Sequence, residues 1–174
     1  MSRQDLDGVR VAVLTLSDSM ARGEHADTSG DVVVEAVGSL GAEVIARDVL
    51  PDDAARISAR LRAYADDSHA DLVLTTGGSG VAPRDVTPEA TLQVVDRLVP
   101  GIVETARART FERTPLAILS RGVAGIRGRT LIVNLPGSPK GVREWLDVIL
   151  PVLQHAVELL KERPRPWGES HAKR

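Results

Sequence analysis

The chain has 174 residues, of which 43% are hydrophobic and 26% charged, values typical of a globular protein with one sizeable core. Its formal net charge is −2, positive and negative residues are interspersed, and aromatic residues make up only 2% of the chain. This composition gives no basis for binding nucleic acid or an acidic membrane surface. The absence of cysteine excludes disulfides, thiolate metal ligands and a cysteine nucleophile.

The N-terminal residues, MSRQDLDG, lack the apolar core of a signal peptide, and no apolar run approaches the roughly 18 residues of a membrane span. We therefore expect a cytoplasmic protein. The composition along the chain further predicts a flexible N-terminus over residues 1–8, a single domain over 9–163, and a polar, proline-rich, disordered tail over 164–174.

Short apolar runs rich in branched residues alternate with helical stretches. A polar loop is expected over residues 17–29, and Thr87-Pro88-Glu89 predicts a helix start at which Thr87 caps the helix. The predicted strands are 9–16, 43–50, 71–76, 115–120 and 130–134. The predicted helices are 30–41, 52–66, one beginning at Thr87, one from Gly101 to Thr114, and 140–162 with a kink at Pro151.

Strands that alternate with helices imply crossover connections. The pattern predicts an α/β fold of three layers, with a mostly parallel sheet and helices on both faces. In such sheets, ligands bind beyond the carboxyl ends of the strands. The candidate site residues at that edge, or in the loops that follow it, are Ser17, Asp18, Asp52, Thr76, Gly77, Gly78, Ser79, Gly80, Arg84, Asp85, Ser120, Asn134, Pro136, Gly137, Ser138 and Lys140.

The stretch TTGGSGVAPRD, residues 75–85, suits a phosphate cradle, because successive backbone N–H groups of a glycine-rich turn can converge on an anion. It is neither a P-loop nor a dinucleotide fingerprint, since the Gly-Lys-Ser/Thr and the third glycine are missing. Arg84 could balance phosphate charge, while Asp85 and Asp52 could hold Mg²⁺ together with phosphate oxygens. The alternatives are that Asp52 or Asp53 caps the next helix and that Asp85 only fixes a turn.

A second candidate anion site is NLPGSPK, residues 134–140, which joins a predicted strand to the N-terminus of a helix. Ser138 could instead cap that helix. Asn134 could recognise a polar heterocycle with its amide or bridge two backbone segments, and Ser120-Arg121 has the same ambiguity.

Together these motifs resemble the Mog, MoaB and gephyrin G-domain family of molybdenum cofactor biosynthesis. The matching segments are LTLSDS, DTSG, LPDD, TTGGSGVAPRDVTPEAT, and PLAILSRGVAGIRGRTLIVNLPGSPKG with the following ILP. They occur in family order and cover roughly residues 9–160. One departure is Ser79, where the family commonly has threonine; the hydroxyl is retained.

The resemblance implies that the chain uses Mg²⁺ and ATP to adenylylate molybdopterin, releasing pyrophosphate. It implies that Asp52 and Asp85 are the essential acidic residues, that Gly77 to Gly80 hold phosphate, and that Ser120 and Asn134 bind the pterin. It also implies a homotrimer, with a hexamer as an alternative, and a molybdate-inserting partner of the MoeA type.

Three alternatives remain at this point. The first is a MoaB-like paralogue that binds molybdopterin with little or no transferase activity. The second is a binding or scaffold module, because related domains also occur in assembly proteins. The third is a CinA-like nucleotide hydrolase, which shares the fold and the glycine-rich segment.

Overall fold

The structure, a computed structural model, describes residues 6–162. The predicted tail, 164–174, lies outside the described residues, as do residues 1–5 of the predicted flexible N-terminus. Residues 6–8 are placed differently from the prediction: Leu6 is 1% exposed and its N–H donates to the Leu40 carbonyl at 2.7 Å. A single leucine in a polar segment has no periodic pattern, so no sequence signal indicates this core contact.

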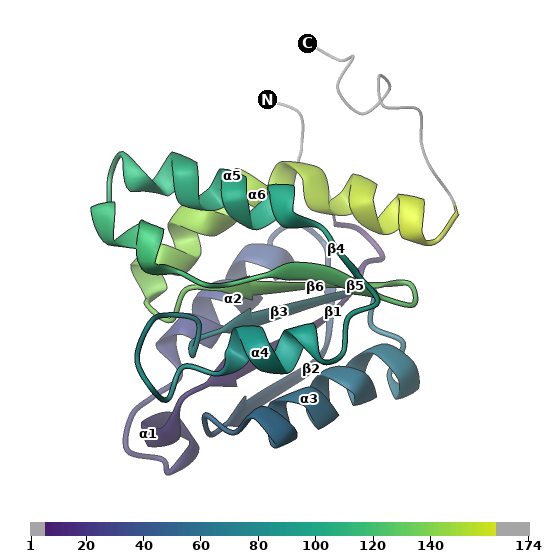
Figure 1. The fold of residues 1–174 in the computed structure, drawn as a ribbon. Coiled ribbons are helices and arrows are strands. Elements are labelled where there is room, and N and C mark those ends of the chain that lie inside the picture. Colours follow the sequence, from purple (N-terminus) through teal and green to yellow (C-terminus); the bar gives the residue numbers. More distant parts are fainter. Residues whose placement is uncertain (1–5, 163–174) are drawn as a thin grey trace.

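The centre of the protein is a six-stranded sheet in the order β2-β1-β3-β6-β5-β4 (Figure 1). The strands β2, β1, β3 and β6 pair in parallel, whereas β5 runs antiparallel to both of its neighbours. The mostly parallel sheet is therefore confirmed. The strand bounds are β1 (Arg10–Leu16), β2 (Glu43–Leu50), β3 (Leu72–Thr76), β4 (Arg97–Leu98), β5 (Ala124–Arg127) and β6 (Thr130–Leu135).

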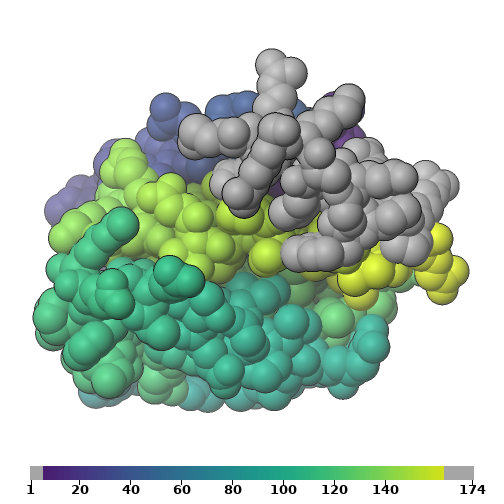
Figure 2. All heavy atoms as spheres, turned by 90° about the horizontal axis from the view of Figure 1, so that it is seen from above, coloured from purple at the N-terminus to yellow at the C-terminus, as the bar shows by residue number. Residues whose placement is uncertain are grey.

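Helices cover both faces of the sheet, as predicted. On one face α2, α5 and α6 enclose the larger hydrophobic core, with α6 between the other two (Figures 1 and 2); on the other face α3 and α4 enclose a smaller core. The helices are α1 (Asp18–Ala21), α2 (Thr28–Gly38), α3 (Ala54–Arg62), α4 (Thr87–Leu92), α5 (Pro100–Phe111) and α6 (Pro139–Leu160). A π-helical segment, Ala63–Asp67, extends α3, and a 3₁₀ helix, Pro115–Leu119, follows α5.

The central strands are continuous apolar runs because both of their faces are buried. Along β1, Val11 and Val13 belong to the larger core, whereas Ala12, Leu14 and Leu16 belong to the smaller one. This arrangement leaves polar residues only where the strands end, and the carboxyl ends of all four parallel strands lie at one edge of the sheet.

One strand prediction and one loop prediction near the edge of the sheet are wrong. The run 115–120 forms a 3₁₀ helix, in which Leu116 is 73% and Ile118 65% exposed, because Pro115 has no N–H for a sheet ladder and no layer covers the segment. The predicted loop between 120 and 130 contains β5, which pairs with β6 through a tight turn at Gly128.

Two smaller predictions also differ. Residues Asp18–Ala21 of the predicted loop form the short helix α1, with Ser17 as its N-cap. Thr87 does not cap α4; its hydroxyl donates to the Gly77 carbonyl at 3.0 Å, so it supports the glycine-rich segment instead. Helix α6 continues through Pro151, and the kink expected there stays a prediction.

We expect Leu6→Ala to lower the free energy of unfolding by about 2–5 kcal/mol, because it removes a buried side chain from the larger core. Urea denaturation measures this change. The control is Leu159→Ala, since Leu159 is 51% exposed and its truncation should change stability by no more than about 0.5 kcal/mol. Equal stability losses in the two variants would show that Leu6 does not pack as described.

Candidate functional site

The candidate residues meet at the carboxyl edge of the parallel strands. Ser17 and Asp18 follow β1, Asp52 follows β2, and the glycine-rich segment follows β3. The β6 strand leads into Pro136 and the N-terminus of α6. Four separate parts of the sequence thus form one site, as the parallel topology requires.

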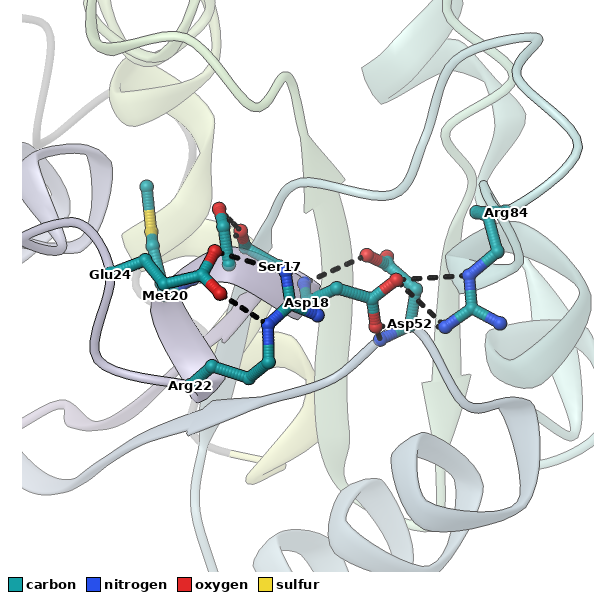
Figure 3. A network of polar contacts seen from close by, with 8 residues as sticks. Ser17, Asp18, Met20, Arg22, Glu24, Asp52 and Arg84 are labelled. Atoms are coloured by element: carbon teal, nitrogen blue, oxygen red, sulfur yellow. Dashed lines mark hydrogen bonds and ion pairs between the residues drawn. The ribbon is translucent and has the colours of Figure 1, made fainter.

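Asp18 and Asp52 are joined by two reciprocal hydrogen bonds, each from the backbone N–H of one residue to the carboxylate of the other, and Arg84 binds the carboxylate of Asp18. The N–H of Asp18 donates to Oδ2 of Asp52 at 3.3 Å, and the N–H of Asp52 donates to Oδ1 of Asp18 at 3.1 Å. Nε and Nη2 of Arg84 donate to the two carboxylate oxygens of Asp18 at 2.9 and 2.8 Å (Figure 3). The Arg84 guanidinium, together with the Asp52 N–H, lowers the pKa of Asp18.

Asp52 is in a less favourable environment than Asp18. Its Oδ1 is buried and has no hydrogen-bond partner among the described residues. Burial raises the pKa of Asp52; the Asp18 N–H opposes this rise, and the negative charges of Asp18 and Asp85 add to it. Asp53, and not Asp52, caps α3 by accepting the Arg56 N–H at 2.9 Å, so Asp52 remains available for a ligand.

The glycine-rich segment packs tightly against Asp52 and β1. Gly77 and Gly78 have φ angles of +96° and +61°, the left-handed region that favours glycine. A Cβ on Gly77 would lie 2.2 Å from the Leu16 carbonyl, and one on Gly78 would lie 2.7 Å from Oδ1 of Asp52. These two positions therefore require glycine.

Side-chain hydroxyls connect the same segment to β6. Thr76 donates to the Pro136 carbonyl at 2.7 Å, and the buried Ser79 donates to the Leu135 carbonyl at 3.2 Å. The segment after β3 and the segment after β6 are thereby fixed relative to each other.

Asp85 lies in a turn that begins at Ala82. Its Oδ2 accepts the Ala82 N–H at 2.9 Å, and a Cβ on Gly80 would lie 2.8 Å from the same oxygen. Asp85 does fix the turn, as one alternative proposed. Because a carboxylate accepts up to about four hydrogen bonds, this contact leaves capacity for a ligand.

The donor set fits Mg²⁺ that is bound jointly with a phosphate, but it does not fit a fully protein-built metal cage. Over residues 6–162, no three His, Cys, Asp or Glu side chains lie close enough together to hold a metal ion. Mg²⁺ usually binds through one or two carboxylates and completes its shell with water and substrate phosphates. The unpartnered Oδ1 of Asp52, with Asp85 near enough to raise its pKa, is the observation that supports this fit.

Beside the glycine-rich segment lies a cavity of about 290 Å³. One side is built from Ser79, Gly80 and the start of α6, and the other from α5 and the apolar 3₁₀ helix. Glu144, at 12% side-chain exposure, lines it together with Thr110 and Trp145. The full lining is Ser79, Gly80, Thr110, Thr114, Leu116, Ala117, Leu119, Ser120, Pro136, Gly137, Ser138, Gly141, Glu144 and Trp145.

The polar groups of this cavity wall are poorly satisfied. Thr110 Oγ1 and Trp145 Nε1 are buried without a hydrogen-bond partner among the described residues. The Glu144 carboxylate has only long contacts, at 3.3 and 3.4 Å to Thr114 Oγ1 and 3.7 Å to Lys140 Nζ. Such unmet capacity is costly unless a ligand satisfies it.

Some of the remaining predicted residues line the cavity, one is exposed and one is buried away from it. Ser120, Pro136 and Gly137 line the cavity, and Ser138 both lines it and caps α6 by accepting the Gly141 N–H at 3.1 Å. Lys140 is 72% exposed, and its Nζ lies 3.7 Å from Glu144 of the cavity wall. Asn134 is fully buried. Its amide nitrogen donates to the hydroxyls of Thr75 and Thr91, and its amide oxygen accepts the Val123 N–H, so it bridges segments as the alternative stated. The expectation that Asn134 contacts a ligand directly is therefore corrected.

Comparison with known proteins agrees with this geometry. The family described as "probable molybdopterin binding domain" matches residues 12–155. The chain belongs to this family, which acts in molybdenum cofactor biosynthesis. It is 38% identical to a molybdopterin adenylyltransferase of Helicobacter pylori, over 87% of this chain and 88% of the relative.

Two further proteins are similar to this member of the molybdopterin-binding family over most of its length. The crystal structure of the molybdopterin biosynthesis enzyme MoaB from Thermus thermophilus has a TM-score of 0.85 and 51% identity, covering 90% of this chain and 98% of that one. The molybdenum cofactor synthesis protein cinnamon of Drosophila melanogaster is 38% identical over 96% of this chain, which spans only 28% of cinnamon.

The sequence did not single out Glu144, and it marked Arg121 only as an ambiguous neighbour of Ser120, without the contacts that Arg121 makes. Glu144 lies in the first turns of an amphipathic helix, where a glutamate is ordinarily on the surface, so no local signal distinguishes it. Arg121 follows Ser120 directly, and its contacts with residues 79–89 join segments that the sequence does not place together.

We expect Gly78→Ala to cost about 1–3 kcal/mol more of the free energy of unfolding than Gly128→Ala. Both glycines have similar positive φ angles, +61° and +56°, so the backbone strain is matched. Only at Gly78 would the new methyl group meet Asp52 and Thr87, since nothing lies within 4 Å at Gly128. Chemical denaturation of both variants measures the difference, and equal costs would contradict the close packing.

We expect Asp52→Asn to raise the melting temperature at pH 7 by a few degrees. The raised pKa means that the folded protein binds a proton at Asp52 more readily than the unfolded chain does. Stability is therefore lost as the pH rises from the pKa of Asp52 in the unfolded chain through its higher pKa in the folded protein. The asparagine carries no charge and avoids this cost. Thermal scans should show the gain shrinking as pH falls toward about 4, the ordinary carboxyl range; a loss at pH 7, or a gain independent of pH, would contradict the assignment.

Proposed function

We propose that the protein is a molybdopterin adenylyltransferase, which transfers AMP from ATP to the terminal phosphate of molybdopterin. The observation that carries the proposal is that the glycine-rich segment and the cavity share a wall. Ser79 and Gly80 belong to the segment, which lies beside Asp52 and Asp85, and they also line the cavity of about 290 Å³. A phosphate on the segment and a heterocycle in the cavity would therefore be neighbours. The 38% identity to a named adenylyltransferase supports it.

In the proposed reaction, an oxygen of the molybdopterin phosphate forms a bond to the α-phosphorus of ATP. The bond from that phosphorus to the bridging oxygen breaks, and pyrophosphate leaves with the electron pair. The attacking phosphate is already ionised at neutral pH, so no general base is required. The demands on the protein are positioning of two anions and neutralisation of their charge.

The residues at the sheet edge are suited to these demands. The backbone N–H groups of the segment from Gly77 to Gly80 would bind phosphate oxygens, and Arg84 would add positive charge if it exchanged Asp18 for a phosphate. Asp52 and Asp85 would hold Mg²⁺ against the same phosphates. The metal would supply charge stabilisation to the transferring and leaving phosphoryl groups.

The cavity wall is suited to a pterin. A pterin carries an amino-pyrimidinone edge that presents N–H donors, and the Glu144 carboxylate, nearly buried and without a short hydrogen bond, would accept them. The apolar 3₁₀ helix would pack on the ring faces. Ser138 in the cavity wall, and Lys140 near Glu144, would contact the chain of atoms between ring and phosphate.

One alternative has a specific observation in its favour. The MoaB structure is 51% identical to this chain, which exceeds the identity to the H. pylori adenylyltransferase. A protein that binds molybdopterin without transferring AMP is therefore the second candidate. Both acidic residues are present here, which favours transfer.

The resemblance further suggests a homotrimer, or a hexamer, that delivers its product to a molybdate-inserting enzyme of the MoeA type. The chain spans only half the length of a bifunctional molybdenum cofactor biosynthesis protein of Chlorobaculum tepidum, which agrees with a second activity joined to this domain in that relative. Sedimentation analysis would settle the assembly.

The decisive assay incubates the protein with molybdopterin and Mg²⁺-ATP and detects adenylylated pterin by mass spectrometry. We expect product from the wild type and an at least about 100-fold lower rate from Asp85→Asn, which removes a charge that would hold the metal. Asp67→Asn, an exposed aspartate away from the site, is the matched control and should retain the rate. Pterin binding without product in the wild type would favour the MoaB-like alternative.

We expect Glu144→Gln to weaken molybdopterin binding by about 10-fold or more, the effect of losing a charge-assisted hydrogen bond. Fluorescence titration with molybdopterin measures this affinity in the absence of ATP. Glu104→Gln, on the exposed side of α5, provides the control with the same chemical change. Equal affinities for the two variants would remove Glu144 from the proposed pterin contacts.

A further inference from the structure

Arg121 makes an unusual set of contacts with the segments that carry the candidate site. Its Nε donates to the Gly80 carbonyl at 2.6 Å, and its Nη2 donates to the Asp85 carbonyl at 2.6 Å. Its Nη1 binds the Glu89 carboxylate in the first turn of α4, and its backbone N–H donates to the Ser79 carbonyl at 2.7 Å. One residue from the loop before β5 thus connects the glycine-rich segment, the Asp85 turn and α4.

These contacts determine how the two segments face each other. The carbonyls of Gly80 and Asp85 both point at one planar guanidinium, which fixes their separation and prevents the repulsion of two unpaired carbonyl oxygens. In a trans peptide the C=O and the following N–H point in opposite directions. The N–H groups of Gly80 and Val81 therefore point away from Arg121, and neither has a hydrogen-bond partner within residues 6–162.

The same residue adjoins the pterin cavity. Ser120, the preceding residue, lines that cavity, and its backbone carbonyl accepts a hydrogen bond from Arg107 at 3.3 Å. Displacement of the 120–121 segment would therefore disturb the cavity wall and the glycine-rich segment together.

We propose that Arg121 is a positioning residue for adenylyl transfer: it holds the glycine-rich segment and the Asp85 turn in the relative geometry that binds Mg²⁺-ATP beside the pterin cavity. The proposal deepens the proposed function and rests on it for the catalytic part. Arg121 acts through Gly80 and Asp85, and needs no contact with the substrate. A displacement of about 1 Å between reacting groups costs on the order of 100-fold in rate, which sets the scale of the expected effect.

The protein offers a matched comparison at the opposite end of the sheet. Arg127 donates to the Asp66 carboxylate and to the Val94 carbonyl at 3.0 Å, and its side chain is 25% exposed, against 37% for Arg121. Both arginines connect distant segments through a carboxylate and a backbone carbonyl. A purely structural role would give Arg121→Met and Arg127→Met the same consequences.

The test compares Arg121→Met with Arg127→Met in two measurements on the full chain. The first is calorimetric titration with Mg²⁺-ATP, which needs no turnover. The second is the rate of AMP transfer to molybdopterin, with and without added guanidinium chloride at low millimolar concentration. Guanidinium can enter the space that the shortened side chain leaves, and it restores the bonds to the two carbonyls only if those bonds are what the site requires.

We expect Arg121→Met to bind Mg²⁺-ATP about 10-fold more weakly and to lose about 100-fold in kcat, with partial recovery in guanidinium. Arg127→Met should match the wild type in both measurements. If Arg121→Met is poorly folded, Glu89→Gln takes its place, because it removes one partner of Arg121 and should lower kcat by several-fold.

The proposal is overturned if Arg121→Met retains wild-type affinity and kcat, if its losses equal those of Arg127→Met, if guanidinium restores nothing, or if Glu89→Gln, used in its place, keeps the wild-type kcat. A wild type that binds Mg²⁺-ATP but transfers no AMP would instead overturn the proposed function. In that case weaker nucleotide binding by Arg121→Met would still support its positioning role.

Discussion

The concentration of negative charge at the carboxyl edge of the sheet is the constraint on which the rest of the site depends. Parallel strands bring Asp18 and Asp52 into contact, and the turn after β3 adds Asp85. Arg84 neutralises Asp18, whereas burial and the neighbouring carboxylates raise the pKa of Asp52. Such an arrangement costs stability in the folded protein, and a bound cation would relieve that cost.

The packing around these carboxylates explains why the local sequence is so restricted. Gly77 and Gly78 lie in the left-handed region with no room for a side chain, and the hydroxyl of Thr87 supports the first of them. Hydroxyls of Thr76 and Ser79 fix the same segment to the end of β6. The result is a rigid support beside a cavity in which Thr110 Oγ1 and Trp145 Nε1 lack partners among the described residues. This arrangement suits the proposed transfer between two bound substrates.

Patterns along the chain predicted the parallel part of the fold because β1, β3 and β6 are buried on both faces and, like the half-buried edge strand β2, appear as short branched runs. They failed at the other edge: the run Pro115–Leu119 is apolar yet half exposed, while Ala124–Arg127 is a strand whose short, glycine-containing sequence resembles a loop. The acidic residues and the glycine-rich segment could be predicted because their position after strands is local information. The surroundings of Glu144 and the contacts of Arg121 could not, since both arise between segments 20 or more residues apart, although the position of Arg121 beside Ser120 had made it an ambiguous candidate.

The most direct test of the account is a crystal structure of the protein with adenylylated molybdopterin. We predict the AMP phosphate against Gly77–Gly80, within reach of Asp52 and Asp85, and the pterin in the neighbouring cavity with its amino-pyrimidinone edge at Glu144. A pterin bound elsewhere, or an AMP phosphate remote from the two aspartates, would contradict the central claim that the two halves of the site share the wall formed by Ser79 and Gly80.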